Sequence, residues 1–294
     1  MITLAQIQQA TEEALIKASC GFRPDQKAAY QRAIVSEQEP GTRGMLEMML
    51  ENAHISEQNT LALCDDTGIP HVTLDIGEDA DIEGSMGKLL PAVVAGIQDG
   101  LRALPGRPMA VKGDDLERLA QSAGLHNDSG LLEPAPIRIK SVQGNQVTVH
   151  VLMNGGGPEI RSKTFRIFHH HDANHVFDEI ADWAIEVVEL LGCTPCVPAI
   201  GIGRTHYEAT NLMLDAMTYR DFGDETEAEK HITQKLNASF TGSLGVGGTV
   251  TALQTFIKVG PQRASGVRIA TLRMGCSIDP RRGSVTLGPS IQAL

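Results

Sequence analysis

Three of the five cysteines lie in settings that could carry chemistry. Cys64 lies in LCDDTG, Cys193 in GCTPCVPAIGIG and Cys276 in MGCSIDPRRG, each beside glycine, proline or aspartate near a predicted element end. Loops at element ends are where proteins commonly hold ligands and substrates. If three thiolates bind a cubane 4Fe-4S cluster, one iron stays open as a Lewis acid for a carboxylate and a hydroxyl.

Other interpretations of the cysteines stay open at this point. Free cysteines are by default small buried hydrophobic residues, which is how we interpret Cys20 in its amphipathic segment. An odd number of cysteines in a long chain without a secretory signal disfavours a disulfide scaffold. The wide spacing is unlike the compact Cys-x-x-Cys pattern of ferredoxins and zinc ribbons, although the same thiols could bind structural zinc.

The elements that must position these cysteines alternate between helices and strands. Apolar spacing of three and four residues predicts a helical part over about residues 1–57. Period-two and buried apolar runs predict strands, and a hairpin through residues 143–145 is expected to join two of them. The fold class is therefore α/β (mixed α+β), a helical N-terminal region followed by mixed sheet segments flanked by helices. The further helices are expected at 85–104, 176–191, 206–219 and 227–236, and the strands at 61–64, 71–77, 135–142, 146–154, 196–203, 251–259 and 266–274.

Composition excludes several classes of function. The chain has 294 residues, 41% of them hydrophobic, and a formal net charge of -11, so we expect no nucleic-acid partner. The N-terminal segment lacks the apolar stretch of a secretory signal, and no later run is long enough to span a membrane. We therefore expect a cytoplasmic protein without a membrane partner.

Five blocks of sequence together resemble a known family. In order they are CDDTG, NGGG followed by RSK, CTPCVPAIGIG, GSLGVGG and RMGCSIDPRRG, and they extend from about Leu61 to Leu287. They are similar to successive motifs of the alpha subunit of class I fumarate hydratases and L-tartrate dehydratases. The resemblance implies one iron-sulfur hydro-lyase catalytic domain of the alpha type over residues 1–294.

The resemblance also implies a ligand set and a catalytic residue. Cys64, Cys193 and Cys276 occupy the cysteines of their motifs and would hold a 4Fe-4S cluster with one open iron. Cys193 matches better than Cys196 because of its distance to the Gly-x-Gly that follows, so Cys196 is expected to be a buried thiol. Asp66 would lie beside the cluster and orient or transfer a proton, although it could instead only cap the turn at Gly68.

Glycines and cations in the second block are candidates for substrate binding. Gly155, Gly156 and Gly157 resemble the family's glycine triplet, where backbone amides can approach an anion, although a plain tight turn would also use glycine. Arg161 and Lys163 could supply positive charge for a carboxylate. Alternatively, they are two exposed cations on a loop.

The sequence also departs from the family pattern. His126 stands near the position of an arginine that fumarases of this class usually carry, which puts fumarate itself in doubt if that arginine binds a carboxylate. Arg204 replaces a further glycine and could supply the missing charge. Under that hypothesis, Arg204→Ala weakens turnover far more than folding.

Two other charged clusters are expected to be peripheral. The run from His169 to Asp172 has adjacent side chains that point in different directions, so a solvated loop is favoured over a zinc site, with one histidine turned toward the cleft at most. Arg281 and Arg282 are expected to be surface or subunit-interface charges.

The resemblance implies a function and a partner. The enzyme would reversibly add or remove water across a carbon-carbon bond of a small hydroxy-dicarboxylic acid, such as the pairs fumarate/malate or tartrate/oxaloacetate. A separate beta subunit would complete the site in an alpha2beta2 heterotetramer. The alternative is a non-catalytic cluster-binding or redox-sensing protein.

Overall fold

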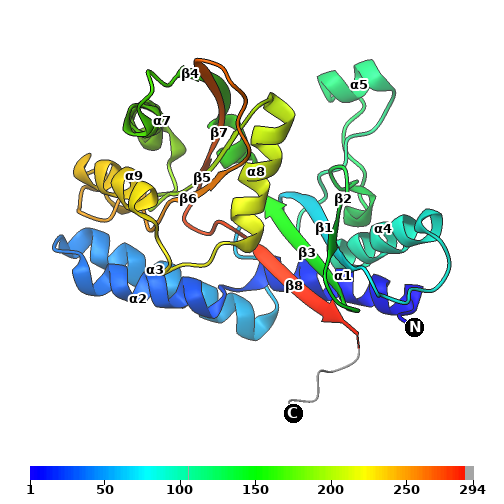
Figure 1. Cartoon of the computed structure of the whole chain (residues 1–294). Helices are drawn as coiled ribbons and strands as arrows, with labels where there is room; N and C mark the ends of the chain where they lie inside the picture. The colour runs from blue at the N-terminus through cyan, green and yellow to red at the C-terminus, as the bar shows by residue number, and fades with distance from the viewer. Residues whose placement is uncertain (105, 289–294) are drawn as a thin grey trace, which may run out of the picture. The chain divides into compact units, whose positions relative to one another are not determined.

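The structure, a computed structural model, describes residues 1–104 and 106–288 (Figure 1). It divides into two compact units. Unit 1 comprises Met1–Gly21, Ile55–Gly155 and the segment that begins at Arg281, and unit 2 comprises Phe22–His54 and Gly156–Pro280. Helices and two mixed sheets confirm the predicted fold class. One catalytic domain over the whole chain stays a prediction, because a catalytic domain can contain two compact units.

The N-terminal part is helical, as the sequence predicts. It contains α1 (Leu4–Cys20), α2 (Pro24–Ser36) and α3 (Pro40–Asn59). The first helix begins with a capping box, in which Thr3 and Gln6 satisfy each other's backbone amides. The second has proline at its start, where the missing N–H costs nothing.

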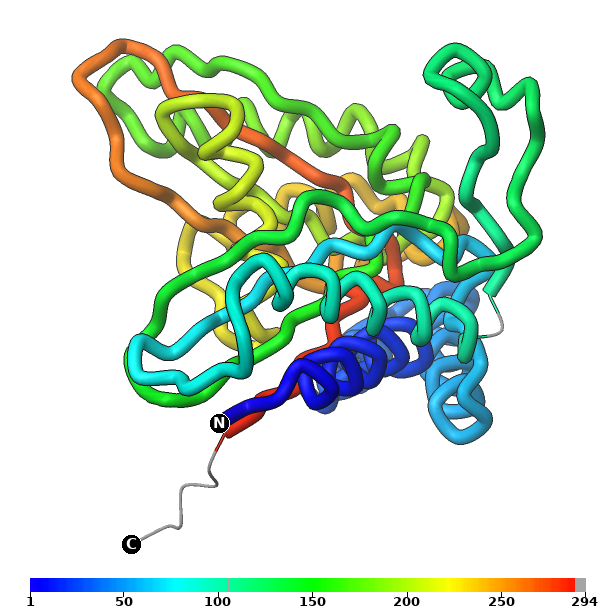
Figure 2. Tube along the Cα trace, turned by 90° about the vertical axis from the view of Figure 1, so that its right-hand side faces the viewer, coloured from blue at the N-terminus to red at the C-terminus, as the bar shows by residue number. Residues whose placement is uncertain are grey.

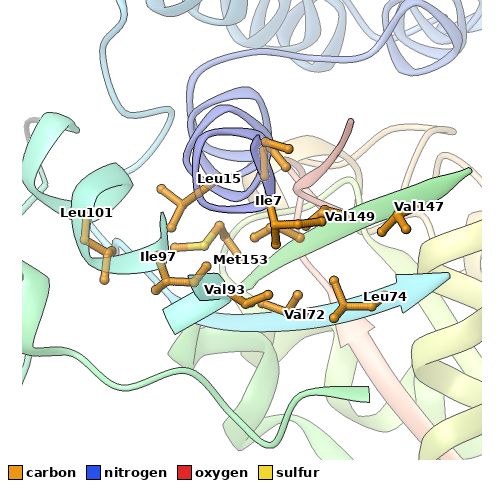
Figure 3. Close-up of a cluster of buried hydrophobic side chains, with 14 of the residues drawn as sticks. Ile7, Leu15, Val72, Leu74, Val93, Ile97, Leu101, Val147, Val149 and Met153 are labelled. Carbon is orange, nitrogen blue, oxygen red and sulfur yellow. The ribbon is translucent and has the colours of Figure 1, made fainter. Parts of the chain in front are cut away.

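Unit 1 is a four-stranded sheet in the order β2-β1-β3-β8, backed by α1 and α4 (Met86–Ala103). Its strands are β1 (Ile69–Gly77), β2 (Arg138–Val142), β3 (Val147–Asn154) and β8 (Arg282–Leu287). Figure 3 shows apolar side chains of both helices meeting those of β1 and β3. Figure 2 shows α1 beside β8, and a Cβ at Gly283 would lie only 2.0 Å from the carbonyl oxygen of Ala14. Unit 1 also contains α5 (Asp115–Ala120), which has no buried residue, and the short η1 (Ser129–Leu131).

Two local predictions for unit 1 are wrong. Residues 61–64 form no strand, because their backbone follows α3 directly and bonds to it and to α1, with Leu63 N donating to Ser19 O at 2.9 Å. The two strands joined by residues 143–145 form no hairpin, because β1 lies between them and pairs with both. The connection crosses the end of β1 at Gly77, where a Cβ would lie 2.3 Å from Gly144 O.

Unit 2 is a second four-stranded sheet, in the order β4-β7-β5-β6. The predicted buried strand after Cys196 is β5, in which every residue is buried. Buried residues of α7 and α9 pack in one core with those of the sheet. The first strand, β4, is missing from the sequence prediction. The strands are β4 (Ser162–Phe168), β5 (Val197–Gly203), β6 (Phe256–Val259) and β7 (Val267–Gly275), and the helical elements are α6 (Gly156–Ile160), α7 (Ala173–Leu191), α8 (His206–Tyr219), α9 (Glu227–Ala238) and η2 (Ser243–Gly245).

Among the residues that the structure describes, no helix combines the length and the apolar character needed to cross a membrane.

Candidate functional site

In unit 2, Cys193 and Cys276 lie at the same end of the paired strands β5 and β7. Strand β5 begins at Val197 and strand β7 ends at Gly275, and these two residues pair across antiparallel strands. The backbone joins the two loops directly, because Ser277 N donates to Cys193 O at 2.9 Å. The side chain of Cys193 is exposed and that of Cys276 is half-buried, so both thiols belong to accessible loops.

The loop after Cys276 is held from one side by a buried ion-pair network. Arg273 is fully buried, and its Nη1 donates to Asp279 Oδ2 at 2.7 Å while its Nε donates to Glu159 Oε1 at 3.0 Å. Asp279 Oδ2 also accepts from Cys276 N at 3.1 Å. Burial lowers the pKa of Arg273, but the two carboxylates outweigh it and raise that pKa above its usual range. Arg273 therefore stays protonated within this ion-pair network, beneath the Cys276 turn.

Helix α2 holds the same loop from another side. Tyr30 is fully buried, and its hydroxyl donates to Ser277 O at 2.7 Å. Gln26 Nε2 donates to Ile278 O at 3.2 Å and to Asp279 O at 3.3 Å. Helix α2 therefore holds the backbone of the loop directly, a contact that its sequence pattern alone does not indicate.

The glycine triplet lies where the chain passes from one unit to the other. Gly155 belongs to unit 1, and Gly156 and Gly157 begin α6 in unit 2. The Glu159 carboxylate of α6 contacts Arg273, and Ser162, which follows α6, pairs with Arg273. In unit 2, Gly156 and Gly157 therefore lie at the end of the strands where Cys193 and Cys276 also lie.

The two cations after the triplet each have a contact within unit 2. Arg161 Nε donates to Leu190 O at 3.0 Å, near the end of α7. Lys163 Nζ lies 5.0 Å from the ring centre of Phe165 and 5.2 Å from that of Trp183, a cation-π geometry. Lys163 is part of β4 rather than of a loop, because its residue pairs with Leu272. Contacts of either side chain with substrate stay a prediction.

In unit 1, Cys64 begins an irregular turn that leads into β1. The Asp66 side chain does cap this turn, because Gly68 N donates to Asp66 Oδ1 at 3.1 Å. Gly68 has a φ of +83°, which favours glycine over any other residue. Burial raises the pKa of the Cys64 thiol, while the Asp66 amide and the Arg281 guanidinium act in the opposite direction.

Arg281 lies under this turn, and the prediction that it is a surface or interface charge is wrong. The residue is 4% exposed. Its Nη1 donates to Asp66 O at 2.8 Å and to Thr67 O at 3.3 Å. These partners are separated from Arg281 by more than 200 positions in the chain, so no local pattern could reveal the contact.

The remaining two cysteines are buried, as expected. Cys196 is 0% exposed, and burial raises the pKa of its thiol well above the usual range. Cys20 is 5% exposed, and burial raises the pKa of its thiol to about 11. Both thiols behave as small core residues rather than as thiolates available to a ligand.

Two further candidates are His126 in unit 1 and Arg204 in unit 2. His126 lines a pocket of about 640 Å³ in unit 1, together with Ile69 and Glu133. Arg204 directly follows β5, at the opposite end of this strand from Cys193. Its guanidinium pairs with the Glu208 carboxylate, with Nε 3.0 Å from Oε2. The structure therefore does not bring Arg204 to the cysteines of unit 2, and nothing supports the compensation hypothesis.

The histidine run forms the solvated loop that the sequence predicts. His170, His171 and Asp172 are exposed, and His169 bonds to Ser265 O at 2.8 Å through Nε2. This loop follows β4, at the end of that strand away from α6. Within either unit, the described residues contain no group of three or more His, Cys, Asp or Glu side chains that could hold a metal ion.

Comparison with known proteins defines the class of enzyme. The model of the fumarate hydratase (Fumerase) family matches residues 8–286, so the chain belongs to this family, whose members are hydro-lyases. The chain is also 26% identical over 282 residues to a Methanocaldococcus jannaschii protein named "Putative L(+)-tartrate dehydratase subunit alpha". That alignment covers 93% of each chain.

Proposed function

We propose that this hydro-lyase adds water to, or removes it from, a small hydroxy-dicarboxylic acid, with a 4Fe-4S cluster held by Cys64, Cys193 and Cys276. The observation that carries the proposal is the backbone bond between Ser277 N and Cys193 O, which joins the loops of two of these cysteines within unit 2. Fumarate/malate and tartrate/oxaloacetate are the proposed substrate pairs, because the family is named for fumarate and the relative for tartrate.

The chemistry of the available donors fits such a cluster. The three proposed ligands are the cysteines that are not fully buried, and all three lie on loops. The other two thiols lie in cores. The cluster would supply a Lewis-acidic iron for the hydroxyl and one carboxylate of the acid.

The residues of the chain would bind the acid and move its proton. Asp66 would hold or transfer a proton at its carboxylate, since its backbone is fixed by Arg281 and its Oδ1 by Gly68 N. Backbone amides of Gly155, Gly156 and Gly157 would approach a carboxylate without interference from side chains. Arg161, Lys163 and His126 are proposed as further substrate contacts, whereas Arg204 is left out.

A partner subunit is part of the proposal. The relative is named as an alpha subunit, which implies a beta subunit beside it. We infer that this chain also works with a separate beta subunit, in an alpha2beta2 assembly. We further infer a cytoplasmic location.

An anaerobic assay tests the function. The chain is produced together with its beta subunit, loaded with iron and sulfide, and supplied with fumarate, L-malate and the two enantiomers of tartrate in turn. We expect reversible hydration or dehydration of at least one of these acids. A cluster-loaded complex that converts none of them would contradict the proposal and favour the redox-sensing alternative.

A further inference from the structure

The turn from Cys64 to Gly68 belongs to no helix or strand, yet it carries both a proposed ligand and the proposed acid-base residue. Arg281 provides the bonds that shape it. One terminal nitrogen, Nη1, donates to the carbonyl of Asp66 at 2.8 Å and to that of Thr67 at 3.3 Å. Because the two acceptors belong to successive peptide groups, the guanidinium fixes the orientation of both.

Two glycines make room for this guanidinium. A Cβ at Gly68 would lie 2.5 Å from Arg281 Nη2 and 3.1 Å from the carbonyl oxygen of Asn154. A Cβ at Gly155 would lie 3.0 Å from the same Nη2 and 3.0 Å from Asp66 Oδ2. Glycine at these two positions therefore allows the Arg281 side chain and the Asp66 carboxylate to occupy one narrow slot in unit 1.

Arg281 is itself held in place. Its carbonyl accepts from Met153 N at 3.0 Å, and β8 begins at the next residue, Arg282, which pairs with Leu152. Its Nε is buried and has no hydrogen-bond partner among the described residues. Burial of a charged guanidinium is unfavourable, so a neutral side chain would fill this space better if shape alone were its role.

We propose that Arg281 is a positioning residue of the hydro-lyase reaction, which holds the Cys64 thiol and the Asp66 carboxylate in one fixed orientation. The proposal rests on the roles proposed above for Cys64 and Asp66. Arg281 touches neither the substrate nor the cluster in this account, and it acts through the two carbonyls. It also keeps a positive charge under a turn that would face an anionic acid.

The first test uses the metal-free chain and does not depend on catalysis. Arg281→Lys keeps the charge, but its side chain is one bond shorter, so the ammonium cannot reach the position of Nη1 between the two carbonyls. In hydrogen exchange followed by mass spectrometry, we expect peptides that cover residues 63–69 to exchange about tenfold faster or more, with β1 and β3 unchanged. The control is Arg282→Lys, the adjacent arginine in β8. Equal exchange of the turn in wild type and Arg281→Lys would overturn the proposal.

The second test measures the reaction in the loaded complex with the beta subunit. We expect Arg281→Lys to keep its iron content while kcat falls about tenfold or more and KM changes much less, because Asp66 is misaligned. Wild-type kcat in this variant would overturn the proposal, and so would a defect that appears in KM alone. If wild type converts no acid, the proposed function fails, and the exchange experiment still decides whether Arg281 holds the turn.

A third variant perturbs the slot without altering the arginine. Gly155→Ala adds one methyl group at a position where Arg281 Nη2 and Asp66 Oδ2 both lie 3.0 Å away. We expect the same faster exchange at residues 63–69. The control Gly266→Ala adds a methyl group where no atom lies within 4 Å. Equal exchange of the turn in the two alanine variants would overturn the slot as the basis of the positioning.

Discussion

Each unit contains a cysteine loop that lies over a buried arginine, the Cys64 loop in unit 1 and the Cys276 loop in unit 2. The two arginines differ in the partners that compensate their charge. In unit 2, Arg273 under the Cys276 loop is paired with two carboxylates, Asp279 and Glu159. In unit 1, Arg281 under the Cys64 loop donates to neutral carbonyls of Asp66 and Thr67. The charge of the first arginine is more than matched by two carboxylates, whereas the second arginine brings positive charge to the turn that carries Asp66.

This difference separates a structural task from a chemical one. A charge that is matched by buried carboxylates stabilises a fixed loop but presents little field to a ligand. A charge bound by carbonyls retains most of its field, which favours an anion such as a carboxylate nearby. We therefore expect changes at Arg273 to act mainly on stability, and changes at Arg281 mainly on turnover.

The largest expected effect comes from removal of the Arg273 charge. Arg273→Met leaves Asp279 buried without its cation, so we expect the free energy of unfolding to fall by about 3–5 kcal/mol. Urea unfolding of the metal-free chain measures it. Arg204→Met, which breaks an exposed pair with Glu208, is the control and should cost less than about 1 kcal/mol. A smaller loss for Arg273→Met than for Arg204→Met would remove the structural half of the comparison.

The next effect sharpens the account of the Arg281 slot. Gly68→Ala combines a left-handed φ with a Cβ 2.5 Å from Arg281 Nη2, whereas Gly144→Ala has a φ of +103° and no atom within 4 Å. Backbone strain alone should cost about 1–3 kcal/mol at either site, and the clash should make Gly68→Ala the worse of the two. Thermal unfolding of both variants measures the difference, and equal losses would show that Gly68 makes no room for Arg281.

The smallest effect concerns a cysteine outside the comparison. Cys196 is a core residue, so Cys196→Ala should remove about 1 kcal/mol of stability and leave bound iron unchanged. Denaturation and iron analysis of the same preparation measure both quantities. Loss of iron from this variant would instead assign Cys196, three residues after Cys193, as a ligand.

The regular elements were predictable from sequence because they depend on local pattern. Strand β5 follows from its apolar run, and α8 begins and ends at the predicted residues His206 and Tyr219. The insertion of β1 between β2 and β3 was not predictable, since a short loop with glycine normally indicates a hairpin. Strand order is set by packing over the whole sheet rather than by the loop.

The sequence indicated the candidate cysteines but not the contacts that support their loops. Motif positions indicated Cys64, Cys193 and Cys276. The amphipathic segment around Cys20 and the motif match of Cys193 in place of Cys196 correctly predicted that Cys20 and Cys196 are buried. The buried arginines depend on contacts that close only in the folded units, such as that between Arg281 and Asp66. A charged residue beside a second arginine gives no local signal of burial.

Iron analysis of cysteine variants tests the central claim most directly. Wild type and the five single cysteine-to-alanine variants are loaded anaerobically with iron and sulfide, and bound iron is measured together with the absorbance of the cluster. The account predicts about four iron atoms per chain in wild type, Cys20→Ala and Cys196→Ala, and loss of a stable cluster in Cys64→Ala, Cys193→Ala and Cys276→Ala. A full cluster in any of these last three variants would contradict it.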